Sequence, residues 1–209
     1  MTLSLSGLSG RVQRELIDGF GSPEAVLEAS NEQLLGTGGI TLAHVAKLRR
    51  AQAEAVSEEL LQKLAQLEVR LLPISAGDYP CLLREIEDPP ALLFVRGELT
   101  KRDELAVAVV GTRKPSPYGQ MVAVRLTQEL VRRGFTIVSG LAEGVDADAH
   151  RAAVEAGGRT IAVLACGIDV NYPTANAKLR EQIVASGAVV SELAPGTPPT
   201  RDRFPLRNR

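Results

Sequence analysis

Hydrophobic and polar positions follow two different patterns along the chain, and the pattern changes at about residue 69. Before that point, apolar side chains recur at the 3.6-residue spacing of helices that bury one face. This spacing predicts helices around residues 12–17, 23–29, 32–35 and 42–68. The first part of the chain is therefore expected to be a small all-α domain, residues 1–68.

From residue 69 onward, short β-branched runs alternate with amphipathic segments. They predict strands at residues 69–74, 91–95, 105–110, 135–138, 160–164 and 188–191, and helices at residues 118–133, 146–156 and 175–186. The run at 105–110 is continuously apolar, as in strands buried on both faces of a parallel sheet. Because strand, loop and helix repeat over the last four strands, residues 69–209 are expected to form an α/β domain with a doubly wound parallel sheet.

Composition excludes several classes of protein. The chain has 209 residues, of which 44% are hydrophobic and 23% charged, which is typical of a globular protein. Two cysteines and two histidines are too few and too scattered for a disulfide framework or a zinc site. No apolar run approaches the roughly 20 residues that cross a bilayer, and the N-terminus lacks a secretory signal pattern. We therefore expect a cytoplasmic protein.

Net charge leaves room only for a local nucleic-acid site. The formal charge is −1 and aromatic residues make up 3%, which argues against a wide stacking platform. The last nine residues, however, contain four arginines and one aspartate. The Gly-rich turn at residues 35–43 resembles a helix-hairpin-helix turn, but residues 1–70 hold 7 Lys and Arg against 9 Asp and Glu. We therefore interpret its glycines as permitting a close helix crossing.

Two loops after predicted strands carry the candidate chemistry, because ligands of such sheets bind beyond the carboxyl ends of the strands. The loop at 111–119 combines a glycine, two hydroxyl groups and the cations Arg113 and Lys114, which suits a phosphate. The loop at 139–150 begins with Ser139 and Gly140 and precedes a helix that we expect to be capped near Asp146. It predicts a second nest of backbone amides for an anion.

Other motifs point away from catalysis. Neither dinucleotide-binding nor P-loop glycine spacing follows any strand, so no nucleotide cofactor is indicated. Asp146 and His150 stand four residues apart, which favours a contact along one helix over a catalytic pair of Ser139 and His150. Cys166 is interpreted as a small buried residue. The rings of Tyr118 and Tyr172 are expected to pack under their loops.

Taken in order, the loop motifs resemble one family, the bacterial DNA-processing protein A (DprA/Smf) family. The resemblance covers about residues 70–209 and rests on Asp78-Tyr79-Pro80, Asp88-Pro89-Pro90 with Leu93-Phe94 and Gly97, Val110-Gly111-Thr112-Arg113 with Tyr118-Gly119, residues 139–146 with His150, Gly167-Ile168-Asp169 with Tyr172-Pro173 and Asn176, Ser191-Glu192 with Pro195-Gly196, and residues 204–209. The helical part is similar to the sterile-alpha-motif-like or helix-hairpin-helix-like extension of many members.

The resemblance implies an extended Rossmann-like domain that binds single-stranded DNA without sequence preference and is not an enzyme. Members protect incoming strands during natural transformation and recombination, and help load the RecA recombinase over single-strand-binding protein. Together with the phosphate-binding loop, the implied DNA site comprises Gly111, Thr112, Arg113, Lys114, Ser139, Gly140, Lys178, Arg207, Asn208 and Arg209. No cofactor or metal is expected.

One departure from the family concerns length. Members continue past the Arg-Asn-Arg motif with a helix and strands that carry the homodimer surface and the recombinase contact, whereas this sequence stops at Arg209. An uncovered last strand would be a pairing hazard, so we expect a fragment of a longer protein.

Two alternatives to DNA binding stay open. The first is a nucleotide-processing enzyme resembling the lysine-decarboxylase-like phosphoribohydrolases, whose Pro-Gly-Gly-x-Gly-Thr loop does not occur in these residues. The second is a protein-interaction scaffold, which would show no salt-sensitive DNA binding.

Overall fold

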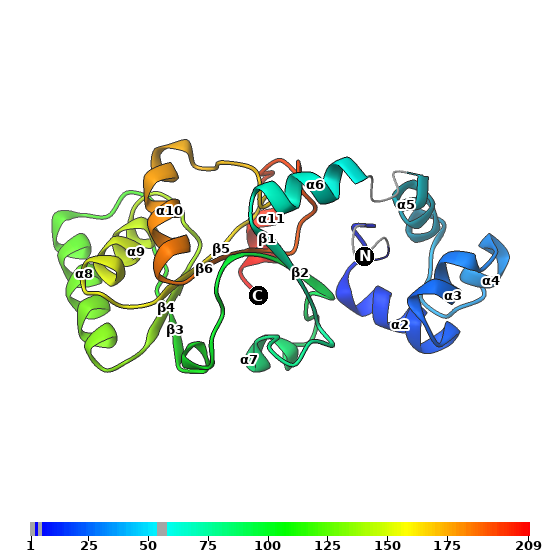
Figure 1. Cartoon of the computed structure of the whole chain (residues 1–209), viewed down its shortest axis with the longest axis horizontal. Helices are drawn as coiled ribbons and strands as arrows, with labels where there is room; N and C mark the ends of the chain where they lie inside the picture. The colour runs from blue at the N-terminus through cyan, green and yellow to red at the C-terminus, as the bar shows by residue number, and fades with distance from the viewer. Residues whose placement is uncertain (1–2, 4–5, 54–57) are drawn as a thin grey trace.

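The structure is a computed structural model that describes residue 3, residues 6–53 and residues 58–209. It is elongated, with a helical unit (α2 to α5) at one end and an α/β unit (α6 to α11) at the other (Figure 1). The C-terminus lies near the middle of the long axis, close to the strands β1 and β2 and to the side of the α/β unit that faces the helical unit.

The helical unit consists of α2 (Gly10–Phe20), α3 (Pro23–Glu28), α4 (Asn31–Leu35) and α5 (Leu42–Ala53). Serine side chains cap the first three of these helices, where each hydroxyl accepts an otherwise unpaired backbone amide. Apolar side chains at the predicted helical spacing form a separate core, in which Leu16, Val26 and Leu34 are completely or almost completely buried. The predicted short helices are thus confirmed.

The long helix predicted at 42–68 is described as α5 and α6 (Glu58–Gln66), and residues 54–57 lie outside the described residues. The α6 helix packs on the sheet, because Leu64 lies in one buried cluster with Leu92 and Phe94. Lys63 of α6 also forms an ion pair with Asp169, with 2.6 Å between Nζ and Oδ2.

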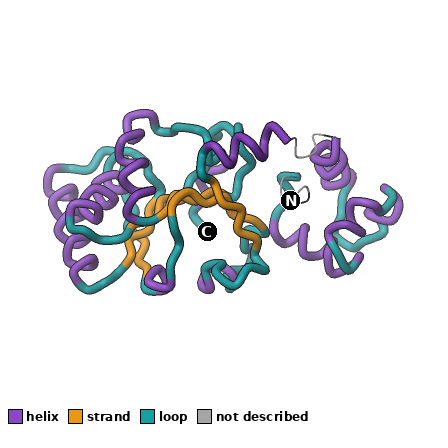
Figure 2. Tube along the Cα trace, in the orientation of Figure 1, coloured by secondary structure: helices purple, strands orange, loops and turns teal. Residues whose placement is uncertain are grey.

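A single six-stranded sheet organises the α/β unit (Figure 2). Its strands are β1 (Val69–Pro73), β2 (Leu92–Gly97), β3 (Ala106–Ala108), β4 (Thr136–Ser139), β5 (Thr160–Val163) and β6 (Ala188–Ser191), in the order β1-β2-β6-β5-β4-β3. The four predicted parallel strands are confirmed, and β1 and β2 extend them as antiparallel strands. The expectation that the last strand is uncovered is wrong, because β2 pairs with β6.

Alternate residues of the strands point into two different buried clusters, as the two-residue period of a strand requires. Phe94 and Val189 pack with Ile183, on the face that α10 covers. Leu93 and Val190 point to the other face and pack around Tyr79. The remaining elements are α7 (Cys81–Arg84), η1 (Lys101–Glu104), α8 (Pro117–Arg132), α9 (Val145–Glu155), η2 (Thr174–Asn176), α10 (Ala177–Ser186) and α11 (Arg203–Arg207). Among the described residues, no helix has the length and apolar character that a membrane span requires.

Asp103 joins η1 to the middle of the sheet. Its carboxylate accepts hydrogen bonds from the Nε and Nη2 atoms of Arg159, both at 2.9 Å, and from the hydroxyl of Thr136 at 2.8 Å and the amide of Thr100 at 2.8 Å. Burial alone would raise the pKa of Asp103, but these donors outweigh it and hold the pKa below its usual value.

Replacing Asp103 should destabilise the α/β unit strongly. The variant Asp103→Ala leaves the partly exposed Arg159 guanidinium with the carbonyl of Glu98 but without its carboxylate, and it removes the acceptor of Thr136 and Thr100, a change that costs about 1–3 kcal/mol. Urea unfolding at pH 7 measures this loss, and Glu104→Ala, at the exposed next residue, should change stability by less than about 0.5 kcal/mol. Equal effects of the two variants would contradict this role of Asp103.

His150 is completely buried in α9 and bonds to a neighbouring strand. Its Nδ1 atom lies 2.7 Å from the hydroxyl oxygen of Thr160, and that hydroxyl donates to the carbonyl of Ile137 at 2.9 Å. Because the hydroxyl proton is already used, we assign the proton of this contact to Nδ1. The predicted contact with Asp146 is therefore replaced by one with Thr160. Burial lowers the pKa of His150 to about 3.

The depressed pKa makes stability depend on pH below neutrality. Between pH 6.5 and pH 3 the unfolded chain binds a proton at His150 that the folded chain does not, so the stabilisation is complete above pH 6.5 and is lost as pH falls. The expected loss is up to about 1.4 kcal/mol per pH unit. Urea unfolding at pH 7, 6 and 5 should show a steeper decline for the unmodified chain than for His150→Asn. Parallel declines would refute the assignment.

Candidate nucleic-acid interface

The loops that follow β3, β4 and β5 meet at one edge of the sheet and, with α11, enclose a pocket. This is the edge at which parallel α/β sheets bind ligands. The pocket has a volume of about 220 Å³. Its lining residues are Arg113, Gly140, Ala142, Glu143, Leu164, Ala165, Cys166, Tyr172, Pro173, Thr174 and Phe204.

Three planar side chains form a row along this pocket. The guanidinium carbon of Arg113 lies 5.2 Å from the ring centroid of Phe204, within the range of a cation–π contact. The rings of Phe204 and Tyr172 are 6.1 Å apart at an interplanar angle of 50°. Tyr172 is 38% exposed, so its ring packs against Phe204 and still reaches solvent. Flat faces of this kind are suited to stacking on nucleobases.

The first predicted loop presents its polar groups to solvent, because Gly111, Thr112, Arg113 and Lys114 are all exposed. The hydroxyl of Thr112 accepts the amide of Lys114 at 3.2 Å and so shapes the turn. Gly144 of the second loop has φ +81°, and a Cβ atom there would lie 2.4 Å from the carbonyl oxygen of Thr112. Close packing of the two loops therefore requires glycine at residue 144.

Arg207 points inward beneath the second loop. Its Nη1 atom donates to the carbonyls of Gly140 at 2.8 Å and Val163 at 2.6 Å. Burial lowers the pKa of this guanidinium, while the nearby carboxylate of Asp146 opposes the shift. A Cβ atom at residue 140 would lie only 2.1 Å from the same Nη1 atom. Gly140 and Arg207 thus fit together as a pair.

The amide nest predicted at residues 139 and 140 has a partner within the chain. The amide of Gly140 donates to Oδ2 of Asp146 at 3.1 Å, and the buried hydroxyl of Ser139 donates to the carbonyl of Val109 at 2.6 Å. The predicted cap at Asp146 is wrong, because Gly144 occupies the N-cap of α9 and Asp146 bonds back to the loop. The acidic side chain at this turn stabilises the loop where an external anion was expected.

Two predictions about single residues have opposite outcomes. Cys166 is buried as predicted, and burial raises the pKa of its thiol. Tyr118 does not pack under its loop, since its ring is 72% exposed on α8.

The remaining predicted site residues, Lys178, Asn208 and Arg209, lie in different surroundings. Lys178 is exposed in the first turn of α10, just after the loop that carries Tyr172. Asn208 accepts a bond from Nε of Arg207 at 2.9 Å. Arg209 lies away from the pocket lining and forms two bonds with Glu192, at 3.1 and 2.5 Å. The pocket therefore brings together Gly140, Arg113 and, behind them, Arg207, whereas Arg209 belongs to a separate ion-pair cluster.

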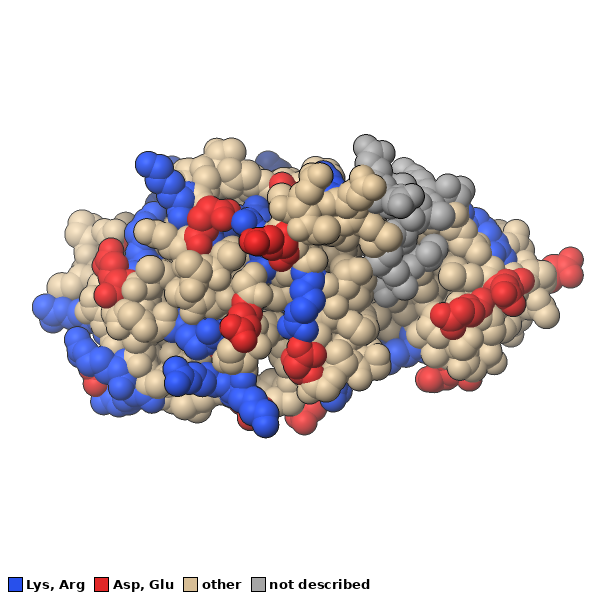
Figure 3. Space-filling model, in the orientation of Figure 1, with Lys and Arg blue, Asp and Glu red and all other residues tan. Residues whose placement is uncertain are grey.

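Sequence reasoning missed two features of this edge. The sequence predicted only that Tyr172 packs under its loop, whereas the fold brings its ring together with that of Phe204. Glu143 adds a carboxylate to the lining. Figure 3 shows that Lys and Arg gather at the lower left of the α/β unit, outside this pocket, while Asp and Glu are prominent on the helical unit. Within the described ranges, no group of three or more His, Cys, Asp and Glu side chains is arranged to hold a metal ion.

Comparisons with known proteins identify the family of this chain. The family model for DNA recombination-mediator protein A matches residues 70–209. Protein Smf of Synechocystis sp. is 44% identical over 155 residues, which are 72% of this chain and 39% of that protein. DNA processing protein DprA of Bacillus subtilis is 42% identical over 142 residues, which are 68% of this chain and 48% of that protein. The matched residues thus span less than half the length of each of these relatives.

Two solved structures are also similar. The crystal structure of DprA from Streptococcus pneumoniae has a TM-score of 0.77 and 33% identity, over 99% of this chain and 71% of that one. A structure of DprA from Helicobacter pylori, described by its single-stranded DNA binding mode, has a TM-score of 0.61 and 34% identity, over 69% of this chain and 64% of that one. The matched residues include the whole sheet and its loops, and the chain therefore belongs to the DNA recombination-mediator protein A family.

Proposed function

We propose that this chain binds single-stranded DNA without sequence preference at the pocket beyond β3, β4 and β5. The row of Arg113, Phe204 and Tyr172 is the observation that carries the proposal, because it combines a cation with two ring faces at the ligand-binding edge of the sheet. The similar Helicobacter pylori protein, whose structure is described by its single-stranded DNA binding mode, supports it.

The ten residues of the proposed site divide into two groups. Exposed Arg113, Lys114 and Lys178 are suited to phosphate contacts, together with the backbone of Gly111 and Thr112. The other five bond to the chain itself: Ser139, Gly140 and Arg207 shape the pocket, while the exposed residues Asn208 and Arg209 hold Arg207 and the loop at Asp88. The carboxylate of Glu143 repels phosphate, so the sugar-phosphate backbone of the DNA is expected to run on the side of Arg113.

Strand preference follows from the stacking surface. A ring in a cavity of about 220 Å³ accepts a base only when that base has left its neighbours in the stack. Every base has a flat face, so the contact is tolerant of sequence. Duplex DNA presents only its phosphates to the same surface.

For the protein as a whole, we propose the roles that the family implies: protection of incoming strands in natural transformation and loading of a RecA-type recombinase in place of single-strand-binding protein. We further propose a cytoplasmic location, a homodimer and a binding role without catalysis. The family model's description as a recombination mediator supports this proposal. Release of free base from a nucleoside monophosphate would contradict the non-enzymatic role and favour the phosphoribohydrolase alternative.

Replacing Arg113 should weaken strand binding and its salt dependence together. In anisotropy titrations with labelled oligo-dT, Arg113→Ala should raise Kd about tenfold, which corresponds to roughly 1.4 kcal/mol. Loss of one phosphate contact should also make the slope of log K against log salt shallower by about 0.7. The control Arg125→Ala removes an exposed arginine of α8 and should leave both quantities unchanged. An unchanged Kd for Arg113→Ala, or equal binding of matched duplex, would overturn the proposal.

The contribution of the Phe204 ring to the affinity for oligo-dT should be separable from that of the charged side chains. Phe204→Leu keeps apolar volume but removes the ring, and a lost base stack costs about 1–3 kcal/mol. We therefore expect at least a fivefold rise in the Kd for oligo-dT, with no change in the salt slope. A Kd equal to that of the unmodified chain would show that the ring does not stack on a base.

A further inference from the structure

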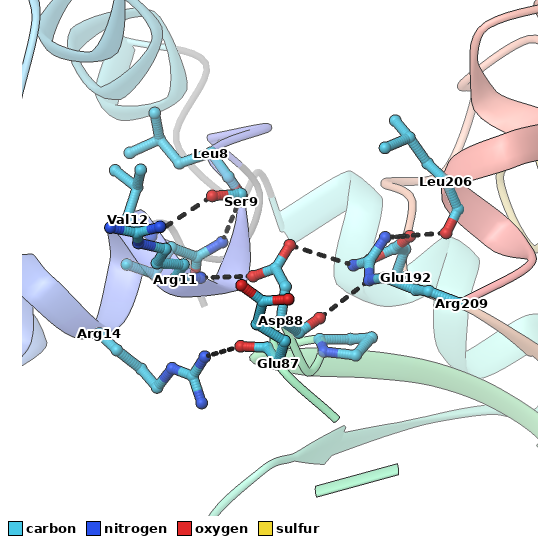
Figure 4. Close-up of polar contacts among 12 residues, drawn as sticks. Leu8, Ser9, Arg11, Val12, Arg14, Glu87, Asp88, Glu192, Leu206 and Arg209 are labelled. Carbon is cyan, nitrogen blue, oxygen red and sulfur yellow. Dashed lines mark hydrogen bonds and ion pairs between the residues drawn. The ribbon is translucent and has the colours of Figure 1, made fainter. Parts of the chain in front are cut away.

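The helical unit contacts the α/β unit through the loop at residues 87–90, before β2 (Figure 4). The first turn of α2 lies on this loop, where the amide of Arg11 donates to Oδ1 of Asp88 at 2.6 Å. The side chain of Arg14 donates to the carbonyl of Glu87 at 2.9 Å. A Cβ atom at Gly10 would lie 2.1 Å from the carbonyl oxygen of Pro89, so the two backbones are in direct contact.

The C-terminal end of the chain holds the same loop from the other side (Figure 4). Nε of Arg209 donates to the carbonyl of Asp88 at 2.8 Å, and Nη2 lies 3.9 Å from Oδ2 of that residue. The guanidinium also bonds to both carboxylate oxygens of Glu192 and to the carbonyl of Leu206 at 2.9 Å. Asp88 therefore lies between α2 and Arg209, which is two residues beyond the end of α11.

The partners of Arg209 leave little room for DNA. A guanidinium has five N–H donors, and those of Arg209 are directed at two carbonyls and both oxygens of Glu192. Its side chain is 26% exposed. A phosphate would have to displace a bidentate carboxylate that is already paired, so this arginine is better suited to holding the chain than to binding a strand.

Arg209 also fixes the far end of the segment that forms one wall of the DNA pocket. Phe204 and Arg207 are both in α11, and Arg207 anchors that helix to Gly140 and Val163. The ion pair of Arg209 with Glu192 and its bond to Asp88 provide the second anchor. Displacement of the loop at 87–90 would remove the Asp88 part of this second anchor, leave Arg209 on Glu192 alone, and loosen the hold on Phe204.

We propose that Asp88 is a positioning residue for the DNA pocket: it couples docking of the helical unit, through α2, to the placement of α11, through Arg209. This inference rests on the proposed function, because its first two tests detect a change in the pocket as a change in the Kd for single-stranded DNA. It assigns the helical unit an effect on affinity without any contact between that unit and DNA.

A matched pair of glycine substitutions in α2 tests the coupling at a distance from the pocket. Gly10→Ala places a methyl group against the carbonyl of Pro89 and should push α2 off the loop, which raises the Kd for oligo-dT roughly fivefold or more at an unchanged salt slope. Gly19→Ala makes the same change in the same helix, where the nearest atom is 3.7 Å away, and should leave Kd unchanged. Equal affinities of the two variants and the unmodified chain would refute the coupling.

A double-mutant cycle tests the path through Arg209. Asp88→Ala and Arg209→Ala should each weaken oligo-dT binding, and the double variant should be no weaker than the worse single variant, because both remove the same anchor. The salt slope should not change in Arg209→Ala. A slope shallower by about 0.7 would identify Arg209 as a direct phosphate ligand and overturn the positioning role. Fully multiplicative effects would also overturn it.

A measurement without DNA separates this inference from the proposed function. In the folded chain, Arg209→Ala should speed hydrogen exchange at the amides that begin α2, including that of Arg11, whereas the control Arg125→Ala should not. Unchanged exchange would refute the coupling even if the chain binds DNA. Failure of the unmodified chain to bind oligo-dT would overturn the proposed function instead.

Discussion

The bonds from Arg207 to the carbonyls of Gly140 and Val163 are the constraint on which the interface depends. Both carbonyls lie at the carboxyl ends of strands, and Arg207 supplies the donor that each of these partly buried groups needs. Because the guanidinium reaches them from α11, the same bonds bring Phe204 to the pocket. Arg207 can reach these carbonyls only if residue 140 has no side chain. The same contact therefore explains why residue 140 is glycine, why residue 207 is arginine and where the ring of Phe204 lies.

Some cationic side chains of this protein hold the fold together, and others remain exposed to solvent. The net charge of −1 gives no sign of a nucleic-acid site, and several arginines are committed within the fold: Arg159 to Asp103, Arg207 to carbonyls and Arg209 to Glu192. Among the predicted site residues, Arg113, Lys114 and Lys178 keep their charges exposed. A site of this kind gains specificity for single strands from ring faces more than from the number of its charges.

Sequence patterns predicted the parts of the fold that depend on neighbouring residues. Apolar runs located the four parallel strands, and helical spacing located α8, α9 and α10, because burial imposes those periods locally. Contacts between distant residues were not predictable in this way. The pairing of β2 with β6, the bond from Asp146 to Gly140 and the approach of Arg209 to Asp88 all depend on topology. The residue types of the site were recognised from its loops, but whether each side chain faces solvent or the chain itself depends on partners that no local motif specifies.

Hydrogen exchange of the chain with and without saturating oligo-dT tests the central claim most directly, because it locates the bound strand on the fold. We expect slowed exchange in the loop at residues 111–116, in the segment 172–178 and in α11, with little change in α3 and α4. Protection confined to the helical unit, for example at the glycine-rich turn of residues 35–43, would contradict it and assign strand binding to the other end of the molecule.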